Sequence, residues 1–310
     1  MVAVDPEVSR AAREQQAGSG RSQAFGARRF DCRNIDYANI PVKSDVIAGI
    51  MRLDVESETC FRELDNYVCS DLGVATLVLR VVNSAFYSHG SHIANIPKAI
   101  SVLGFNVVRS LAMLAFSRSL FGMTRNPMFQ RHVWQHSLLT ALAGQVICTA
   151  LGDAADRDEA FIAGLMHDMG KVLLFNHSQR RYLDVLSLVL NRGLASIEAE
   201  QRSFGCTHLE VGREAVARWK LPDRFVAFMG ADVSSPPAAP LDDPVLVSLA
   251  AGNYLARSNG IGAQPQPDIE ARKAVLASYG VDTGRAAEWS QDAFMASLAE
   301  TEMYRLCASF

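Results

Sequence analysis

Apolar residues recur at intervals of three and four along most of the chain, which is the period of an amphipathic helix. In the first half, capping and breaking residues divide this pattern into short segments. Asp71 precedes one expected helix and Pro97 begins another. Asn106 is expected to cap a third helix, which runs to Phe121. No segment alternates polar and apolar residues as a strand does, so the pattern predicts a compact lobe made of short helices.

Longer helices are expected after the boundary at Asn126-Pro127. They cover residues 129–151, 161–175, 178–191, 196–204, 208–219, 245–257, 269–279 and 291–307, with Asp242 as the cap of the sixth. The predicted fold class is all-α, and the chain is expected to have four parts. These are a mobile tail over 1–36, a helical N-terminal lobe over 37–125, a second helical lobe over 126–260, and C-terminal helices over 261–310.

Composition narrows the class of protein. Of the 310 residues, 49% are hydrophobic and 20% are charged, which suits a globular protein with a large core. The net charge of −3 supplies no phosphate-neutralising surface, so we expect no nucleic-acid binding. No run approaches the roughly 20 apolar residues of a membrane helix, so we expect no membrane association. The six cysteines contain no C-x-x-C pair and are expected to be reduced residues of a cytoplasmic protein.

One apolar stretch, residues 161–175, contains three groups that are costly to bury: His167, Asp168 and Lys171. They must bind one another, a metal or a ligand. On one continuous helix Lys171 lies one turn after His167, so all three side chains reach one centre. His and Asp are ligands for a divalent ion, and the lysine could neutralise a phosphate oxygen. The alternative is a His-Asp pair that only caps or cross-links helices.

Three more histidines lie in the same helical half. His132 and His136 are four residues apart on the helix that precedes this stretch, so they share a face and could offer two imidazoles to one metal. His208 opens a later helix, where it could be a ligand or a cap. Taken singly, each is more often a packed or capping histidine. Their grouping around one His-Asp pair favours a metal site, with His167 and Asp168 at its centre.

Several segments now resemble one family. They are Ile40-Pro41, Val81-Val-Asn-Ser-Ala-Phe-Tyr87, Ile96-Pro-Lys-Ala-Ile-Ser-Val-Leu-Gly104, Val133-Trp-Gln-His-Ser137, Ala163-Gly-Leu-Met-His-Asp-Met-Gly-Lys171, His208-Leu-Glu-Val-Gly212 and Trp219-Lys-Leu-Pro222. In this order, over about 40–231, they resemble the HDOD family, the HD-related output domain of bacterial signalling proteins. The resemblance implies an all-helical N-terminal lobe beside a pseudo-HD lobe. It also implies a role in regulation through other proteins, commonly without demonstrated catalysis.

The resemblance to catalytic HD and HD-GYP proteins is partial. It gives metal or phosphate roles to five residues: His136, His167, Asp168, Lys171 and His208. His132 stands where those enzymes carry an acidic ligand. The histidine pair expected after Leu221-Pro222 is absent, and Asn253 stands in place of the closing aspartate. Asparagine binds metal without charge, so the remnant is expected to hold no ion or one weakly bound divalent ion. A two-metal clamp cannot be assembled from it.

Two classes of function are therefore open. The first is a non-catalytic signalling module that binds other signalling proteins, and the second is a metal-dependent phosphohydrolase acting on a nucleotide or cyclic dinucleotide. A receptor that binds a cyclic dinucleotide without hydrolysis lies between them. The missing ligands favour the first class. The expected partner surface is the turn containing Tyr87, Ser88 and His89, whereas Phe86 is the better candidate for a core anchor.

Overall fold

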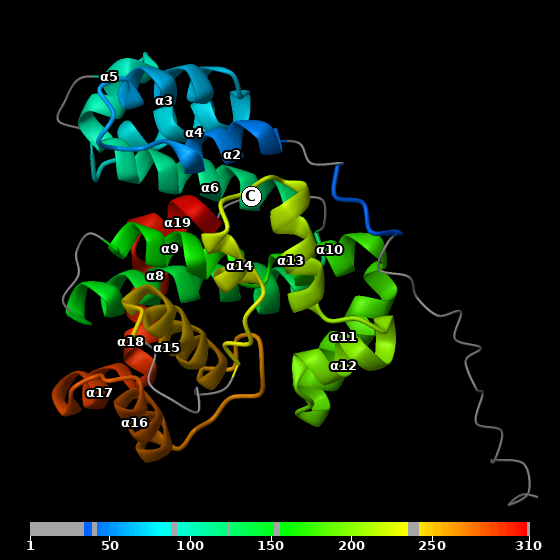
Figure 1. Cartoon of the computed structure of the whole chain (residues 1–310). Coiled ribbons are helices and arrows are strands. Elements are labelled where there is room, and N and C mark those ends of the chain that lie inside the picture. Colours follow the sequence, from blue (N-terminus) through cyan, green and yellow to red (C-terminus); the bar gives the residue numbers. More distant parts are fainter. Residues whose placement is uncertain are drawn as a thin grey trace, which may run out of the picture. The chain divides into compact units, whose positions relative to one another are not determined.

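The computed structural model describes residues 34–38, 42–87, 92–122, 125–151, 156–234 and 242–308. All of them lie in one compact unit. Nearly all of the predicted tail lies outside the described residues. Within the described ranges every regular element is helical, as the sequence predicts, and none is a strand (Figure 1).

The first group of helices follows the predicted capping residues closely. It comprises α2 (Ser44–Arg52), α3 (Cys60–Cys69), α4 (Leu72–Val82), α5 (Ile96–Leu103) and α6 (Phe105–Phe121). The Asp71 side chain accepts hydrogen bonds from the first backbone N–H groups of α4, as predicted. The expectation that Asn106 caps α6 is wrong. Gly104, at φ 82°, turns the chain between α5 and α6, so the helix already begins at Phe105.

The second group of helices lies between Pro127 and Ser258. They are α7 (Pro127–Phe129), the π-helix η2 (Gln130–Gln135), α8 (His136–Leu151), α9 (Arg157–Met166), α10 (Met169–His177), α11 (Gln179–Arg192), α12 (Ser196–Phe204), α13 (His208–Arg218), α14 (Arg224–Met229) and α15 (Pro244–Ser258). The helix expected over 129–151 is therefore not α-helical throughout. Asp243, and not the expected Asp242, caps α15, because its carboxylate accepts the N–H groups of Val245 and Leu246.

The expected helix over 161–175 is also broken. It ends at Met166 and restarts at Met169, with His167 and Asp168 in the turn between α9 and α10. The two halves pack against different helices: α9 packs on α8, whereas α10 packs on α13. His167 and Lys171 therefore do not share a face of one continuous helix, and that expectation is wrong. The turn itself brings the polar side chains together.

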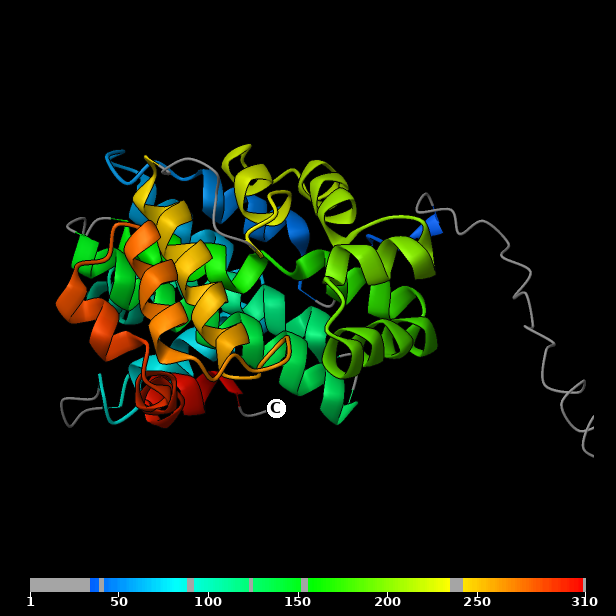
Figure 2. The same ribbon diagram turned by 90° about the horizontal axis from the view of Figure 1, so that it is seen from below.

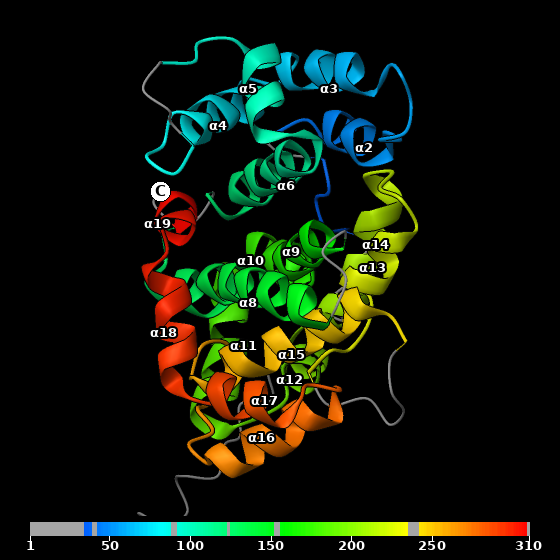
Figure 3. The ribbon, with the colours of Figure 1, turned by 90° about the vertical axis from the view of Figure 1, so that its left-hand side faces the viewer.

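The C-terminal segment forms α16 (Ile269–Ser278), α17 (Thr283–Trp289), α18 (Asp292–Glu300) and α19 (Glu302–Ala308). One helix was expected over 291–307, but Thr301 adopts an extended backbone and separates α18 from α19. Both helices pack on α8. Arg80 of α4 donates a hydrogen bond to the carbonyl of Leu306, so α19 also contacts the first group of helices (Figure 3). Figure 2 shows α18 and α19 (red) well apart from α11 and α12 (yellow-green).

The core residues expected in the second group are confirmed. Seven were predicted and all are buried: Trp134, Leu138, Leu165, Leu173, Phe175, Val211 and Trp219. Trp219 also joins the two groups of helices. Its ring packs edge-on against Phe116 of α6 at 5.0 Å, and its Nε1–H donates to the Tyr37 carbonyl.

The structure bears on two further expectations, that all cysteines are reduced and that no segment crosses a membrane. Cys60, Cys69, Cys148 and Cys307 are free, but Cys206 is disulfide-bonded, so the expectation that all six are reduced is wrong. No other cysteine lies near Cys206 in the sequence, so the sequence carries no local signal of its pairing. Within the described residues, no single helix has both the length and the apolar character to cross a bilayer. The bent pair α5 and α6 passes that test only by length and composition.

Candidate metal centre

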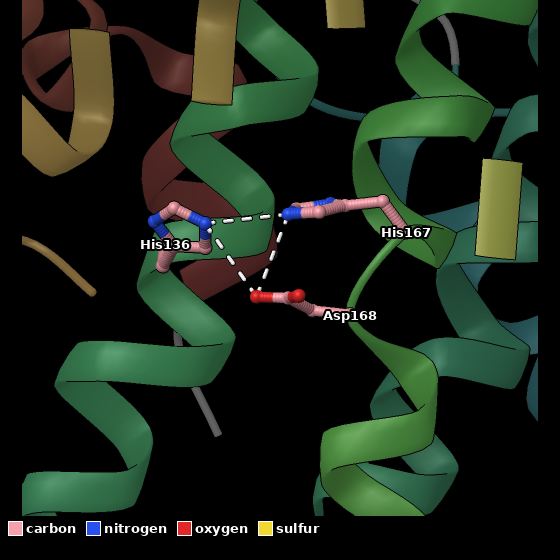
Figure 4. Close-up of side chains that lie close together, drawn as sticks. All are labelled: His136, His167 and Asp168. Atoms are coloured by element: carbon pink, nitrogen blue, oxygen red, sulfur yellow. Dashed lines mark hydrogen bonds and ion pairs between the residues drawn. The ribbon is translucent and has the colours of Figure 1, made fainter. Parts of the chain in front are cut away.

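Three buried side chains converge where α8 begins and where α9 gives way to α10. His136 is the first residue of α8, and His167 and Asp168 occupy the turn (Figure 4). The two Nε2 atoms are 3.3 Å apart, and Asp168 Oδ2 lies 3.5 Å from that of His136 and 3.4 Å from that of His167. The three atoms therefore form a nearly equilateral triangle.

The hydrogen bonds on the far side of each ring set its tautomer. His136 donates through Nδ1 to the Ile261 carbonyl at 2.9 Å, and His167 donates through Nδ1 to the Gly164 carbonyl at 2.8 Å. Burial lowers the pKa of His136 to about 3 and also lowers the pKa of His167, although Asp168 opposes both shifts. Both rings are therefore neutral at pH 7, and each Nε2 presents a lone pair to the other and to Asp168.

Asp168 is ionised at the centre of this cluster. Burial alone favours a higher pKa for Asp168, but His167 and the ammonium of Lys171 outweigh burial and hold the pKa below its usual range. Lys171 Nζ lies 2.9 Å from Oδ2, the same oxygen that faces both histidines. The three ligand atoms therefore lie within 3.5 Å of one another, and the Lys171 ammonium supplies positive charge beside them.

Glu200 is a functional candidate that the sequence reasoning missed. It is fully buried on α12 and its Oε2 accepts both the His208 backbone N–H, at 2.8 Å, and His208 Nδ1–H, at 2.6 Å. Its other oxygen accepts the Tyr182 hydroxyl at 3.0 Å. In this orientation His208 Nε2 lies 3.7 Å from Asp168 Oδ1. The Glu200 carboxylate therefore orients His208 toward the centre, as carboxylates orient metal-bound histidines elsewhere.

Gly170 permits the close approach that brings His208 to Asp168. A Cβ at this position would lie 1.9 Å from the backbone carbonyl oxygen of His208. Only glycine lets α10 and α13 pack this closely. In the sequence, the glycine two residues after the His-Asp pair is the signal that another segment of backbone approaches α10 closely.

Two predicted residues are not part of the convergence. His132 lies in η2, and its Nδ1 accepts the Gly262 backbone N–H at 3.2 Å, outside the group of ligand atoms that lie within 4.8 Å of one another. The intervening turn is π-helical, so the argument from α-helical spacing does not hold there. Asn253 borders the site, but its amide nitrogen donates to the Val233 carbonyl at 2.7 Å.

The cavity beside the cluster is small. It has a volume of about 20 Å³ and is bordered by six polar side chains among others: His167, Asp168, Lys171, His208, Asn253 and Arg257. This volume holds about one water molecule or ion.

Ser88 and His89 of the predicted partner surface lie outside the described residues. Tyr87 is half-buried, and Phe86 is 70% exposed, so the expectation that Phe86 is a core anchor is wrong.

The donor set fits one divalent ion. Ligand atoms about 3.4 Å apart form the edge of a tetrahedron whose metal bonds are roughly 2.1 Å long, the usual length for zinc with nitrogen or oxygen. His136, His167 and Asp168 would hold the ion, with His208 as the next nearest side chain. Two imidazoles favour Zn, Ni or Fe over Mg. Such an ion supplies Lewis acidity to a bound water.

A helical fold with a His-Asp turn between two core helices defines a protein of the HD type. The chain belongs to the HDOD family, because the HDOD domain model matches residues 40–233. An uncharacterized protein from Treponema pallidum is 19% identical over 219 residues, which are 71% of this chain and 42% of that protein. This chain therefore spans less than half the length of that relative.

Solved structures share the fold. An HDOD domain protein from Geobacter sulfurreducens has a TM-score of 0.66 at 21% identity, with 98% of this chain and 97% of that chain covered. A Marinobacter aquaeolei chain provisionally described as a signal transduction protein has a TM-score of 0.66 at 21% identity, with 87% and 60% covered. A Shewanella amazonensis chain provisionally described as a phosphohydrolase has a TM-score of 0.59 at 20% identity, with 85% and 91% covered.

Proposed function

We propose that this HDOD chain is a regulatory module that acts by binding other signalling proteins and does not hydrolyse phosphoesters. Its His-Asp centre holds at most one divalent ion, weakly, and serves to fix α8, α9, α10 and α13 relative to one another. The observation that carries the proposal is the cavity of about 20 Å³ beside Asp168. Small-molecule sites are typically about 300–1,000 Å³, so the described residues leave no room for a nucleotide there.

The ion pair between Lys171 and Asp168 further weakens the binding of a metal ion. The Lys171 ammonium lies 2.9 Å from Asp168 Oδ2, the oxygen that an ion held by both histidines would need. The positive charge of the lysine repels a dication and so weakens its binding. Asn253, which stands where an aspartate would add negative charge, instead uses its amide in a hydrogen bond to the backbone. A second ion has no remaining set of ligands among the described residues.

The related Shewanella amazonensis chain is a reason to test hydrolysis directly. Purified protein is incubated with Zn, Mn, Ni, Fe or Mg and with cyclic dinucleotides, nucleotides or a generic phosphodiester. We expect no turnover above that of the Asp168→Ala protein. Turnover that needs added metal, and that disappears in an Asp168→Ala protein with unchanged Tm, would overturn the proposal and assign a phosphohydrolase.

A further inference from the structure

A second and much larger cavity lies away from the His-Asp centre. It has a volume of about 540 Å³ and is bordered by α6, α8, α9, α18, α19 and the turn after α4. None of its lining residues borders the cavity beside Asp168. Figure 3 shows α18 and α19 beside α8, with α4 and α6 on the other side of α19. We refer to this cavity as the α8–α19 groove.

The walls of the groove are mainly apolar. Six of the side chains that form them are Leu111, Leu142, Val146, Phe161, Leu298 and Leu306. Phe86, which is 70% exposed, also lines the groove. The volume falls in the range of about 300–1,000 Å³ that is typical of small-molecule sites, and such sites combine apolar walls with a few polar groups.

The polar groups of the groove include a buried carboxylate without a close partner. Asp158 is only 8% exposed, yet its Oδ1 lies 3.4 Å from Gln145 Nε2 and 3.6 Å from Arg157 Nε. Charge-assisted hydrogen bonds are usually about 2.7–2.9 Å long, so neither contact satisfies the carboxylate well. The position of Asp158 in the first turn of α9 stabilises its charge. The helix dipole acts on the carboxylate without occupying its oxygens, so the oxygens of Asp158 can still accept hydrogen bonds from a ligand.

A buried hydroxyl in the same groove also lacks a partner. Ser110 of α6 is 6% exposed, and its Oγ has no hydrogen-bond partner among the described residues; Ser84 Oγ is in the same situation. A buried hydroxyl without a partner destabilises the folded protein. A ligand that donates to or accepts from Ser110 would remove this penalty. The serine is therefore a second, independent sign of a ligand.

The charge balance of the lining selects the ligand. The lining contains two carboxylates, Asp158 and Glu302, and one guanidinium, that of Arg157, whose side chain is about half exposed and therefore largely hydrated. Arg109, outside the lining, is a further guanidinium near Asp158: burial lowers its pKa, and the carboxylates of Glu159 and Asp158 oppose that shift. Burial raises the pKa of Tyr87, with Arg157 lowering it and Asp158 raising it, so this phenol shares the same polar surroundings and stays neutral. An anionic ligand head would be repelled by the two carboxylates. A cationic head would be attracted to them.

We propose that the α8–α19 groove binds a small amphiphile with a protonated amine head and an apolar body. The amine donates to Asp158 and lies near Ser110, and the body packs along Leu142 and Val146. Because the walls come from α6, α8 and α19, a bound molecule contacts three separate parts of the fold and also the Phe86–Tyr87 turn. The ligand would thereby control the surface through which the proposed signalling module binds its partner.

This inference rests on the proposed function only in what the ligand signals. Binding itself is measured on the purified full chain without any partner. A failure to bind would leave the absence of hydrolysis untouched, and hydrolysis at Asp168 would leave the α8–α19 groove untouched. The two proposals therefore fail separately.

The probes are n-octylamine and octanoate, which have the same chain length and opposite charge near neutral pH. Each is titrated below its micelle concentration, with calorimetry and Tm as readouts. We expect saturable binding of n-octylamine with a raised Tm, and no binding of octanoate. Asp158→Asn should weaken amine binding at least about tenfold, because a hydrogen bond to a charged group is lost. The matched control Asp184→Asn, at an exposed position of α11, should bind like the unaltered protein.

Val146→Trp supplies an independent test. Val146 lines the groove and is partly exposed, so an indole ring at this position fills the groove without altering the core. It should abolish n-octylamine binding while the circular dichroism spectrum stays helical. Equal binding of octanoate and octylamine would overturn the inference. So would octylamine binding that survives Val146→Trp, or that is as tight in a folded Asp158→Asn protein as in Asp184→Asn. If Asp158→Asn fails to fold, the Val146→Trp result decides.

Discussion

At the scale of single residues, the stability of the His-Asp centre depends on the neutral form of its buried histidines. In the folded state the pKa of His136 is lowered to about 3, whereas the pKa of a histidine in the unfolded chain is about 6.5. The unfolded state therefore binds the proton more readily. The stability that His136 contributes is complete above about pH 6.5 and is lost as the pH falls toward 3.

The resulting pH prediction uses protein treated with EDTA. Its free energy of unfolding should fall by about 2 kcal/mol more between pH 7 and pH 5 than that of His136→Asn, as the pKa difference requires. Urea denaturation at both pH values measures this. The control His92→Asn, at an exposed position, should behave like the unaltered protein. An identical pH dependence for His136→Asn and the unaltered protein would contradict the assignment of a neutral buried ring.

Gly170 makes a second residue-scale prediction. Gly170→Ala places a methyl group against the His208 carbonyl, at a separation that real Cβ atoms do not show, so α10 and α13 must move apart. Overpacking of this kind typically costs about 1–3 kcal/mol. Gly284→Ala, where the new Cβ would meet only the Asp282 side chain at 3.3 Å, is the control. Equal unfolding midpoints for the two variants would show that the close approach has no energetic importance.

At the scale of secondary-structure elements, the turn between α9 and α10 depends on α9 being anchored in the core. Leu165, in the last turn of α9, is completely buried. Leu165→Ala should lower the free energy of unfolding by roughly 2–5 kcal/mol, because it removes apolar contacts and leaves a cavity. Leu72→Ala is the matched control, since Leu72 is 83% exposed and should change stability by no more than about 0.5 kcal/mol. Chemical denaturation compares them, and similar losses would contradict this packing.

The elements also mark the limit of what the sequence predicts. Asp71 and Pro97 identify helix starts because capping and proline act locally. The turn at His167 and Asp168 has no such local signal, since it arises where α9 and α10 follow different partners. Glu200 lies in an ordinary amphipathic segment and reads as a surface carboxylate. Only the tertiary contact with His208 makes it part of the centre.

At the scale of the whole molecule, the turn after α4 combines an exposed Phe86 with Tyr87 at the edge of the α8–α19 groove. Aromatic side chains of this kind are enriched in binding hot spots. Tyr87→Ala should keep its helical spectrum and Tm yet weaken the capture of partner proteins from the native bacterium by tenfold or more, roughly the effect of a hot-spot truncation. The control Phe61→Ala removes another exposed aromatic, on α3. Unchanged capture by Tyr87→Ala would exclude this surface.

The most direct test of the account is the number of divalent ions that one chain binds. Purified protein is stripped with a chelator, reloaded with Zn and examined by native mass spectrometry, with His167→Ala as the comparison. We predict substoichiometric metal after purification and at most one ion per chain after reloading. That ion should be lost in His167→Ala, because three ligand atoms converge at one point and Lys171 competes for the carboxylate. Two ions per chain, held together at this centre and lost together in His167→Ala, would contradict the account.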